Sequence, residues 1–306
     1  MSNLINYEAL VLPGGGIKGL TVLGALNYLY TETTMLNNVH IFSGTSIGGL
    51  IAVFLALGFK PLEIFTKTYR FDKAMECDLQ DLLSIRETYG VKSNANIIDF
   101  AMNIIHQRHP RIITLEDVYK ETGNTVYLAV SNISEEKMEY FSHITHPTMP
   151  LHLAMRMTTN IPFVFTKIQC NPMKFTPSYE PKLDEEQDYF VDGGLLDNCP
   201  VIPVDDGVRN VFVIDIFKKN KKGELGLFEY LYKMITLPAK LSHKHLKMNC
   251  SEKCKVYELD DIDYNILGIN ATLKEREEIF EAGYDQMNKM ILDEELETSG
   301  WGDFEF

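Results

Sequence analysis

The stretch VHIFSGTSIGGLIAVFLALG, residues 39–58, decides the fold because it passes from a strand through a small-residue turn into an apolar helix. Residues 39–43 form a short run rich in strand-forming side chains, and residues 50–57 form an apolar helix that ends at a glycine. Between them lies Gly44-Thr45-Ser46-Ile47-Gly48, a G-x-S-x-G pattern. After a strand and before a helix, this pattern is typical of a nucleophile elbow. The sequence therefore predicts Ser46 as a nucleophile.

The glycines of this turn have a mechanical role. A serine held in a tight, strained turn needs neighbours without side chains, and Gly44 and Gly48 supply them. The helix that follows begins next to Ser46, so its N-terminal amides and dipole favour the anion formed when an ester carbonyl is attacked. The alternative is a small-residue turn without chemistry, because so short a pattern also occurs by chance.

The same strand, loop and helix order occurs just upstream. Residues 7–12 read as a buried strand, residues 13–19 as a glycine loop, and residues 20–30 as a helix. Two such units in tandem favour a parallel sheet covered by helices. We therefore expect an α/β fold, a three-layer α/β/α domain with a mostly parallel central sheet.

The glycine loop Gly14-Gly15-Gly16-Ile17-Lys18-Gly19 also fits the dinucleotide pattern G-x-G-x-x-G. That interpretation needs an acidic residue at the end of the second strand, where this chain has Ser43. A Walker motif needs Gly-Lys-Ser/Thr, and Lys18 is followed by glycine. A loop of backbone amides at the sheet edge of Ser46 suits an oxyanion hole, whose donors are worth about 3 kcal/mol each in the transition state. The hole is predicted from Gly14, Gly15, Gly16, Ile17, Lys18 and Gly19.

The general base is predicted to be an aspartate. His243 and His245 follow Ser46 in the order seen in α/β-hydrolases, but that fold has several strands before its elbow and this chain has one. Asp192 ends the predicted strand 189–191 and is followed by Gly193 and Gly194, which would let the serine turn approach. A carboxylate in a dry site can act as a general base without an imidazole. The alternative for Asp192 is a simple Asp-Gly turn.

Composition narrows the class of protein. The 306 residues carry 29 Lys and Arg against 43 Asp and Glu, a net charge of -14, so nucleic acid is not an expected partner. Five cysteines at irregular spacing indicate reduced thiols rather than a disulfide framework. The N-terminus lacks the pattern of a signal peptide. We expect a cytoplasmic, soluble protein that meets membranes through an apolar patch.

The chain is expected to contain a catalytic core over residues 7–205, a C-terminal α/β extension over 206–292 packed on the same domain, and an acidic mobile tail over 293–306. Within the extension, the apolar side chains of residues 225–237 suit core packing or, as an alternative, a lid or membrane surface. Cys250 and Cys254, with the two histidines at 243 and 245, have residue types that suit zinc, but their spacing is irregular. No metal or cofactor is therefore expected.

Together, Gly14 to Gly19, Gly44-Thr45-Ser46-Ile47-Gly48-Gly49 and Asp192-Gly193-Gly194 resemble the patatin-like phospholipases in order and spacing. The resemblance runs from about Tyr7 to Pro203 and includes the segment 154–163. It implies a Ser46-Asp192 dyad, an oxyanion hole from the glycine loop, and metal-independent hydrolysis of fatty acyl esters of glycerophospholipids.

The resemblance leaves several activities open. A lysophospholipase, a neutral-lipid lipase or an acyltransferase would use the same dyad, and a non-catalytic lipid-binding module is an alternative from another class. The implied partners are a phospholipid or other acyl ester and, transiently, a membrane or micelle surface. Two residues depart from the family pattern. Lys18 stands where arginine is usual, and Asp197, where asparagine is frequent, is close enough in sequence to perturb Asp192.

Overall fold

The computed structural model describes residues 5–68, 85–171, 187–217, 230, 233–234, 237, 250–260 and 271–298. Its strands are β1 Ala9–Leu12, β2 Ile41–Thr45, β3 Gly90–Lys92, β4 Thr125–Asn132, β5 Lys137–Phe141, β6 Phe163–Phe165, β7 Ile168–Cys170, β8 Asp188–Asp192, β9 Val211–Phe217 and β10 Cys254–Asp260. Its helices are α1 Gly19–Glu32, α2 Ile47–Ala56, α3 Pro61–Thr68, α5 Ala95–Arg108, α6 Leu115–Thr122, α7 Leu151–Thr158 and α9 Leu273–Thr298, with 3-10 turns at Gly16–Lys18 and Gly193–Leu195.

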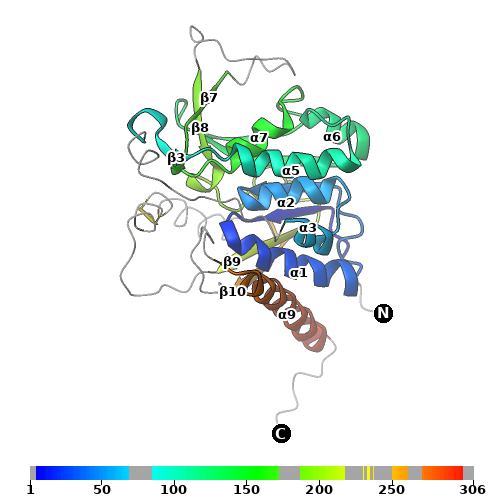
Figure 1. The fold of residues 1–306 in the computed structure, drawn as a ribbon. Helices are drawn as coiled ribbons and strands as arrows, with labels where there is room; N and C mark the ends of the chain where they lie inside the picture. The colour runs from blue at the N-terminus through cyan, green and yellow to red at the C-terminus, as the bar shows by residue number, and fades with distance from the viewer. Residues whose placement is uncertain are drawn as a thin grey trace.

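The centre of the molecule is an eight-stranded sheet (Figure 1). Its order is β10-β9-β1-β2-β4-β8-β7, and β5 pairs with β4 outside this path. The five strands from β10 to β4 run parallel to one another, whereas β5 and β8 run antiparallel to β4, and β7 runs antiparallel to β8. The expected α/β class with a mostly parallel sheet is confirmed.

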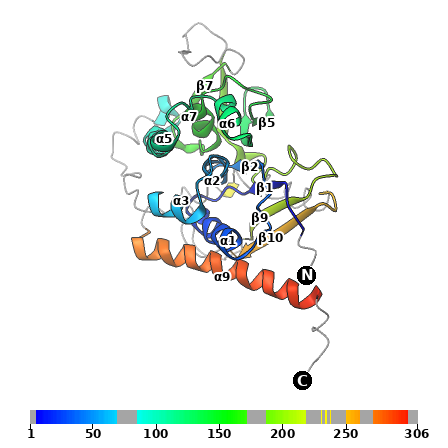
Figure 2. The same cartoon turned by 90° about the vertical axis from the view of Figure 1, so that its right-hand side faces the viewer.

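The two faces of the sheet bury different layers because side chains alternate along each strand. In β1, Leu10 and Leu12 enter the large core, to which α1 and α2 contribute, as do the other described helices. Ala9 and Val11 enter a smaller core that is closed by Cys199, Val201 and Val204, residues of a loop. Figure 2 shows α1, α2 and α3 gathered on one side of β1 and β9. The predicted buried strands therefore contribute side chains to two cores of unequal size, one on each face of the sheet.

The predicted boundaries need one correction at the C-terminus. The acidic tail was expected from residue 293, but α9 continues to Thr298. Glu294 explains the extension, since its carboxylate pairs with Lys255 Nζ at 2.7 Å and accepts a hydrogen bond from the Tyr257 hydroxyl at 2.9 Å. Strand β10 therefore holds the last turns of a helix that its own charge pattern does not favour.

Other expectations fall outside the described residues or were missed. Most of the apolar segment 225–237 lies outside them, as do His243 and His245. The short strands β3, β6 and β7 were not predicted from the sequence. None of the described helices combines the length and the apolar composition that a membrane span requires.

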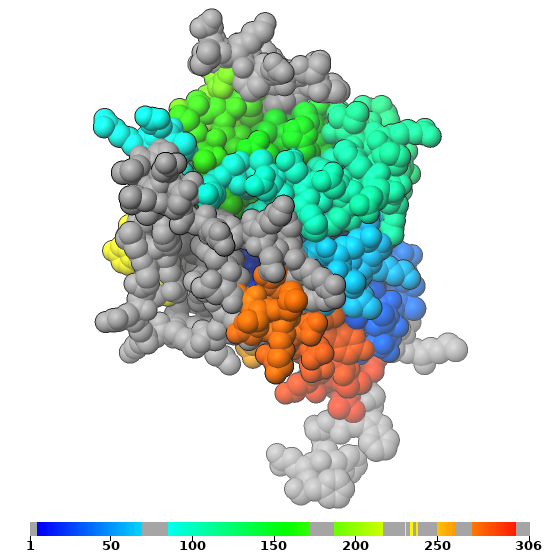
Figure 3. Space-filling model, viewed as in Figure 1, coloured from blue at the N-terminus to red at the C-terminus, as the bar shows by residue number. Residues whose placement is uncertain are grey.

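Helices α1 and α9, from opposite ends of the chain, pack side by side (Figures 1 and 2). The blue and orange-red segments form one continuous surface in Figure 3. Two glycines allow the backbones to approach closely. A Cβ atom on Gly24 would lie 1.8 Å from the Phe280 carbonyl oxygen, and one on Gly283 would lie 2.0 Å from that of Thr21. The contact therefore requires glycine on both helices.

Gly283→Ala should destabilise the protein by about 1–3 kcal/mol, because the added methyl group meets backbone that has no room to move. Chemical denaturation measures the free energy of unfolding, and Glu281→Ala, at an exposed position of the same helix, is the matched control. Equal stability of the two variants would mean that α9 does not pack closely on α1 in solution.

Candidate active site

Strand β4 brings Ser46 and Asp192 together. β2 pairs with β4 up to Thr45 opposite Ala129, and β8 pairs with β4 from Asp192 opposite Val130. β5 pairs with residues on both sides of this point, so it occupies the other edge of β4. β2 and β8 therefore lie end to end along the same edge, and the residue after Thr45 meets the last residue of β8.

Ser46 has the strained backbone of a nucleophile elbow. Its φ of 54° and ψ of −125° are unfavourable for a residue with a side chain. The glycines on both sides leave the room that this turn needs. A Cβ on Gly44 would lie 2.4 Å from the Gly48 carbonyl oxygen, and one on Gly48 would lie 2.5 Å from that of Pro13. The G-x-S-x-G spacing thus has a steric cause.

The amide of Ser46 is held by Thr158, a residue that the sequence analysis did not single out. The Ser46 N–H donates to Thr158 Oγ1 at 3.1 Å, and the Thr158 hydroxyl donates to the Ala129 carbonyl at 2.7 Å. All three residues are buried. Thr158 therefore fixes the elbow to β4, the strand with which β8 and its last residue, Asp192, pair. Nothing in the spacing of a threonine at a helix end could have indicated this role.

The segment 197–200 fastens β2 and the glycine loop to the end of β8. The hydroxyls of Ser43 and Thr45 donate to the carbonyls of Pro200 and Asp197, at 2.7 and 2.9 Å. Asn198 joins Gly14 through two bonds. The Gly14 N–H donates to the Asn198 carbonyl at 2.9 Å, and Asn198 Nδ2 donates to the Gly14 carbonyl at 3.1 Å. These bonds connect the three predicted motifs to one another.

Asp192 is buried beside the serine, with 6% of its surface exposed. Burial raises the pKa of Asp192 to about 6, against the lowering effect of hydrogen bonds from the Ser46 hydroxyl and the Gly194 N–H. The Gly194 bond to Oδ1 is short, at 2.7 Å. Among the described residues, Oδ2 has no hydrogen-bond partner of regular geometry. The bond from Gly194 thus orients the carboxylate through Oδ1 and leaves Oδ2 available to a further donor.

The two glycines after Asp192 have other roles than the one expected. A Cβ on Gly193 would lie 2.3 Å from the Ala129 carbonyl oxygen, so this glycine lets the chain approach β4 rather than the serine turn. Gly194 supplies the amide that binds Asp192 Oδ1. Gly193 thus lets the backbone after Asp192 lie close to β4, and Gly194 orients the Asp192 carboxylate.

The glycine loop lies against the nucleophile, but its amides are not equivalent. A Cβ on Gly14 would lie 3.3 Å from Ser46 Cβ, so this loop contacts the elbow. The amides of Gly14, Lys18 and Gly19 already donate to backbone carbonyls. In the described part of the chain, the amides of Gly15, Gly16 and Ile17 have no backbone acceptor. The six predicted oxyanion donors are thereby narrowed to three candidates.

The Asp197 carboxylate bonds to a tyrosine side chain and to the backbone. Its Oδ2 accepts a hydrogen bond from the Tyr140 hydroxyl at 2.7 Å, and its Oδ1 accepts one from the Cys199 N–H at 3.2 Å. Within the described residues, the side chains suited to a metal ion gather elsewhere, at Asp205, Cys250 and Cys254.

Comparison with known proteins finds one matching family model, viral relatives and solved structures of similar fold. The family model described as patatin-like phospholipase matches residues 10–205. "Probable lipid hydrolase 463L" of Invertebrate iridescent virus 6 is 28% identical over 198 residues, which cover 64% of this chain and only 62% of that protein. "Uncharacterized protein R571" of Acanthamoeba polyphaga mimivirus is 24% identical over 298 residues, 92% of this chain and 93% of that protein. VipD from Legionella pneumophila shares the fold, with a TM-score of 0.54 at 15% identity, over 94% of this chain and 67% of that chain.

Thr158→Val should lower kcat for a simple ester by tenfold or more, because Ser46 loses the acceptor that fixes its amide. A buried, unsatisfied N–H costs about 1–3 kcal/mol, so the melting temperature should fall as well. Thr159→Val is the control. The Thr159 hydroxyl donates to the carbonyls of Met155 and Arg156 and accepts from Asn94 Nδ2 at 3.0 Å, so the bonds it loses do not involve Ser46. A fall in stability with kcat unchanged would limit Thr158 to a structural role.

Proposed function

The chain belongs to the patatin-like phospholipase family, and on that premise we propose that it hydrolyses fatty acyl esters of glycerophospholipids with Ser46 and Asp192 as catalytic dyad. The observation that carries the proposal is the meeting of β2 and β8 on one edge of β4, which sets a strained serine against a buried carboxylate. The relative from the iridescent virus, named as a probable lipid hydrolase, supports the same class of reaction.

In the first step Asp192 accepts the proton of the Ser46 hydroxyl while Oγ attacks the acyl carbonyl carbon. The bond from that carbon to the alcohol oxygen then breaks, and Asp192 returns the proton to the leaving lysolipid. The acyl group remains on Ser46 as an ester. A carboxylate with a pKa near 6 is a stronger base than an ordinary aspartate, yet it is ionised at neutral pH.

In the second step a water molecule replaces the alcohol. Asp192 takes a proton from the water, the hydroxide attacks the acyl carbon, and the bond to Ser46 Oγ breaks as the serine regains its proton. In both steps the carbonyl oxygen becomes negative, and the amides of Gly15, Gly16 and Ile17 are the proposed donors. Each such donor typically contributes about 3 kcal/mol, because it is fixed before the charge develops.

Exposed apolar side chains near the dyad in sequence support contact with a lipid surface. Leu196 follows Asp192 by one short turn, and Phe163 follows the segment that carries Thr158. Both side chains are more than a third exposed. The net charge of -14 does not favour electrostatic attraction to anionic lipid. Contact through apolar side chains therefore suits a surface of neutral lipid.

Ser46→Ala and Asp192→Asn should each lower fatty-acid release from phosphatidylcholine vesicles by at least about 10³-fold, because the two residues act as a unit. Asp197→Asn is the matched control, since this second buried aspartate faces Tyr140. It should keep most of the activity. All variants must first give the circular dichroism and melting curve of a folded protein.

The outcomes of this experiment distinguish between the proposed dyad, a different nucleophile and a protein that binds lipid without cleaving it. Full activity of Ser46→Ala would show that another nucleophile is used. Inactivity of the intact chain on phospholipid, lysolipid, triglyceride and simple esters alike would favour a lipid-binding module. Product analysis of the active protein assigns the acyl position that is cut.

The rate of acyl transfer should rise with pH through the pKa of Asp192. Because this pKa is raised to about 6, the base is largely protonated at pH 5, where kcat/KM should be roughly a tenth of its plateau near pH 8. A pH profile on a substrate without ionisable groups measures this pKa. A profile that is flat down to pH 4.5 would contradict the role of Asp192 as base.

A further inference from the structure

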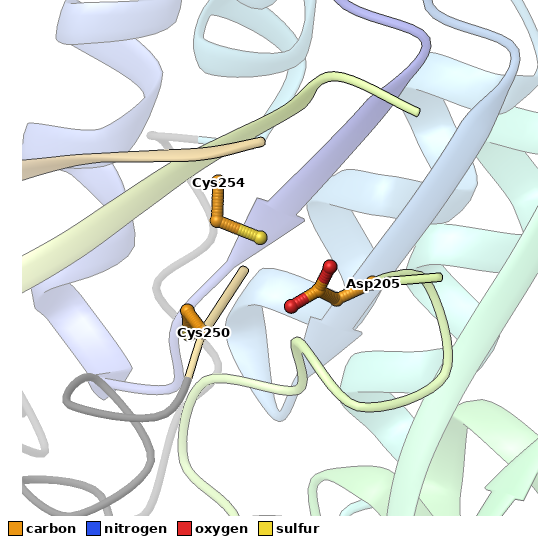
Figure 4. A group of neighbouring side chains, drawn as sticks. All are labelled: Asp205, Cys250 and Cys254. Carbon is orange, nitrogen blue, oxygen red and sulfur yellow. The ribbon is translucent and has the colours of Figure 1, made fainter. Parts of the chain in front are cut away.

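Three side chains, Asp205, Cys250 and Cys254, converge where the parallel strands β9 and β10 begin. The dyad lies at the opposite ends of the parallel strands. Asp205 lies in the loop before β9, and the two cysteines flank the turn that enters β10. Their ligand atoms all lie within 4.8 Å of one another, and all three residues are half-buried. Figure 4 shows the Cys254 sulfur directed at the Asp205 carboxylate, with Cys250 beside them.

The group is held in place by the backbone around it. Asp205 Oδ1 accepts from Ser251 Oγ at 2.6 Å and Oδ2 accepts from the Ser251 N–H at 2.8 Å. The Gly207 N–H also donates to Oδ1, at 3.2 Å. Burial alone would raise the pKa of Asp205, but the bonds from Ser251 outweigh it and keep the pKa below its usual value. These bonds orient the Asp205 carboxylate.

The two sulfur atoms and the carboxylate form a set of ligand atoms that prefers certain metal ions over others. Cys250 and Cys254 pack against the smaller core, so that one side of the cluster is apolar. The Cys254 S–H bonds to the Asp205 carboxylate. A divalent cation could take the place of the thiol protons, and it would balance the charge of the two thiolates and the carboxylate. Two thiolates and one carboxylate suit Zn²⁺, whereas Ca²⁺ and Mg²⁺ prefer oxygen ligands alone.

We propose that Asp205, Cys250 and Cys254 bind one Zn²⁺ ion, with a fourth position open to a further ligand. Cys254 pairs with Val211 at the start of β10 and β9, whereas Ser46 follows the end of β2, which is parallel to them. The ion would therefore lie at the other edge of the sheet from the dyad. The ion would join the edge strand β10 to the loop before β9.

The test is the zinc content of the full chain, purified with a reductant and without chelator, then titrated with Zn²⁺ alone. We expect one Zn²⁺ per chain by elemental mass spectrometry, a higher melting temperature with Zn²⁺, and thiolate charge-transfer absorption when Co²⁺ replaces it. The double variant Cys250→Ser/Cys254→Ser should lose all three signals, and it retains the bonds between Asp205 and Ser251.

Matched variants distinguish the site from its surroundings. Asp205→Asn should bind Zn²⁺ at least tenfold more weakly, whereas Asp206→Asn, the exposed neighbour, should bind as the intact chain does. Ser46→Ala should also keep its zinc, so the result does not depend on the proposed function. Zinc retained by the double cysteine variant, no zinc in the intact chain, or a mass lower by two hydrogens that reports a Cys250–Cys254 disulfide would each overturn the proposal.

Discussion

The hydrogen-bonded edge of β4 is the constraint on which the candidate site depends. Along this edge the parallel partner β2 pairs with β4 as far as Ala129. From Val130 onward the antiparallel partner β8 pairs with β4 instead, and the last residue of β8 lies opposite Val130. A parallel strand and an antiparallel strand that share one edge must meet end to end, so the residues at their ends face each other whatever the loops between them do. Ser46 and Asp192 are far apart in sequence, yet two neighbouring residues of a third strand set their distance.

Much of this arrangement follows from local sequence. The two strand-loop-helix units are predictable because each carries its own breakers, and Gly44 and Gly48 indicate the strained serine because no larger residue fits beside it. Asp192 could be inferred from its place at the end of a strand. The helix α9 could be predicted in type but not in length, since its last turns depend on the contacts of Glu294 with β10.

Features that depend on long-range hydrogen bonds could not be predicted in this way. Thr158 is one of many threonines, and only the pairing of β2 with β4 places its hydroxyl between Ser46 and Ala129. Among the glycine-loop amides, that of Gly14 is occupied by Asn198, which is remote in sequence. Asp205 joins Cys250 and Cys254 because β9 and β10 start side by side. In each case the residue type is common, and the tertiary structure alone gives it a role.

The buried carboxyl of Asp192 also links folding to protons. Its pKa rises from 3.8 in an ordinary setting to about 6 in the folded protein, so between these pH values the folded chain holds a proton that the unfolded chain releases. Stability contributed by this group therefore falls as the pH rises from about 4 to 6 and stays lower above that range, by about 3 kcal/mol at most. Near neutral pH the folded protein therefore buries the charged form of Asp192, although burial of the protonated form would be more stable. The other contacts along the β4 edge offset this loss of stability.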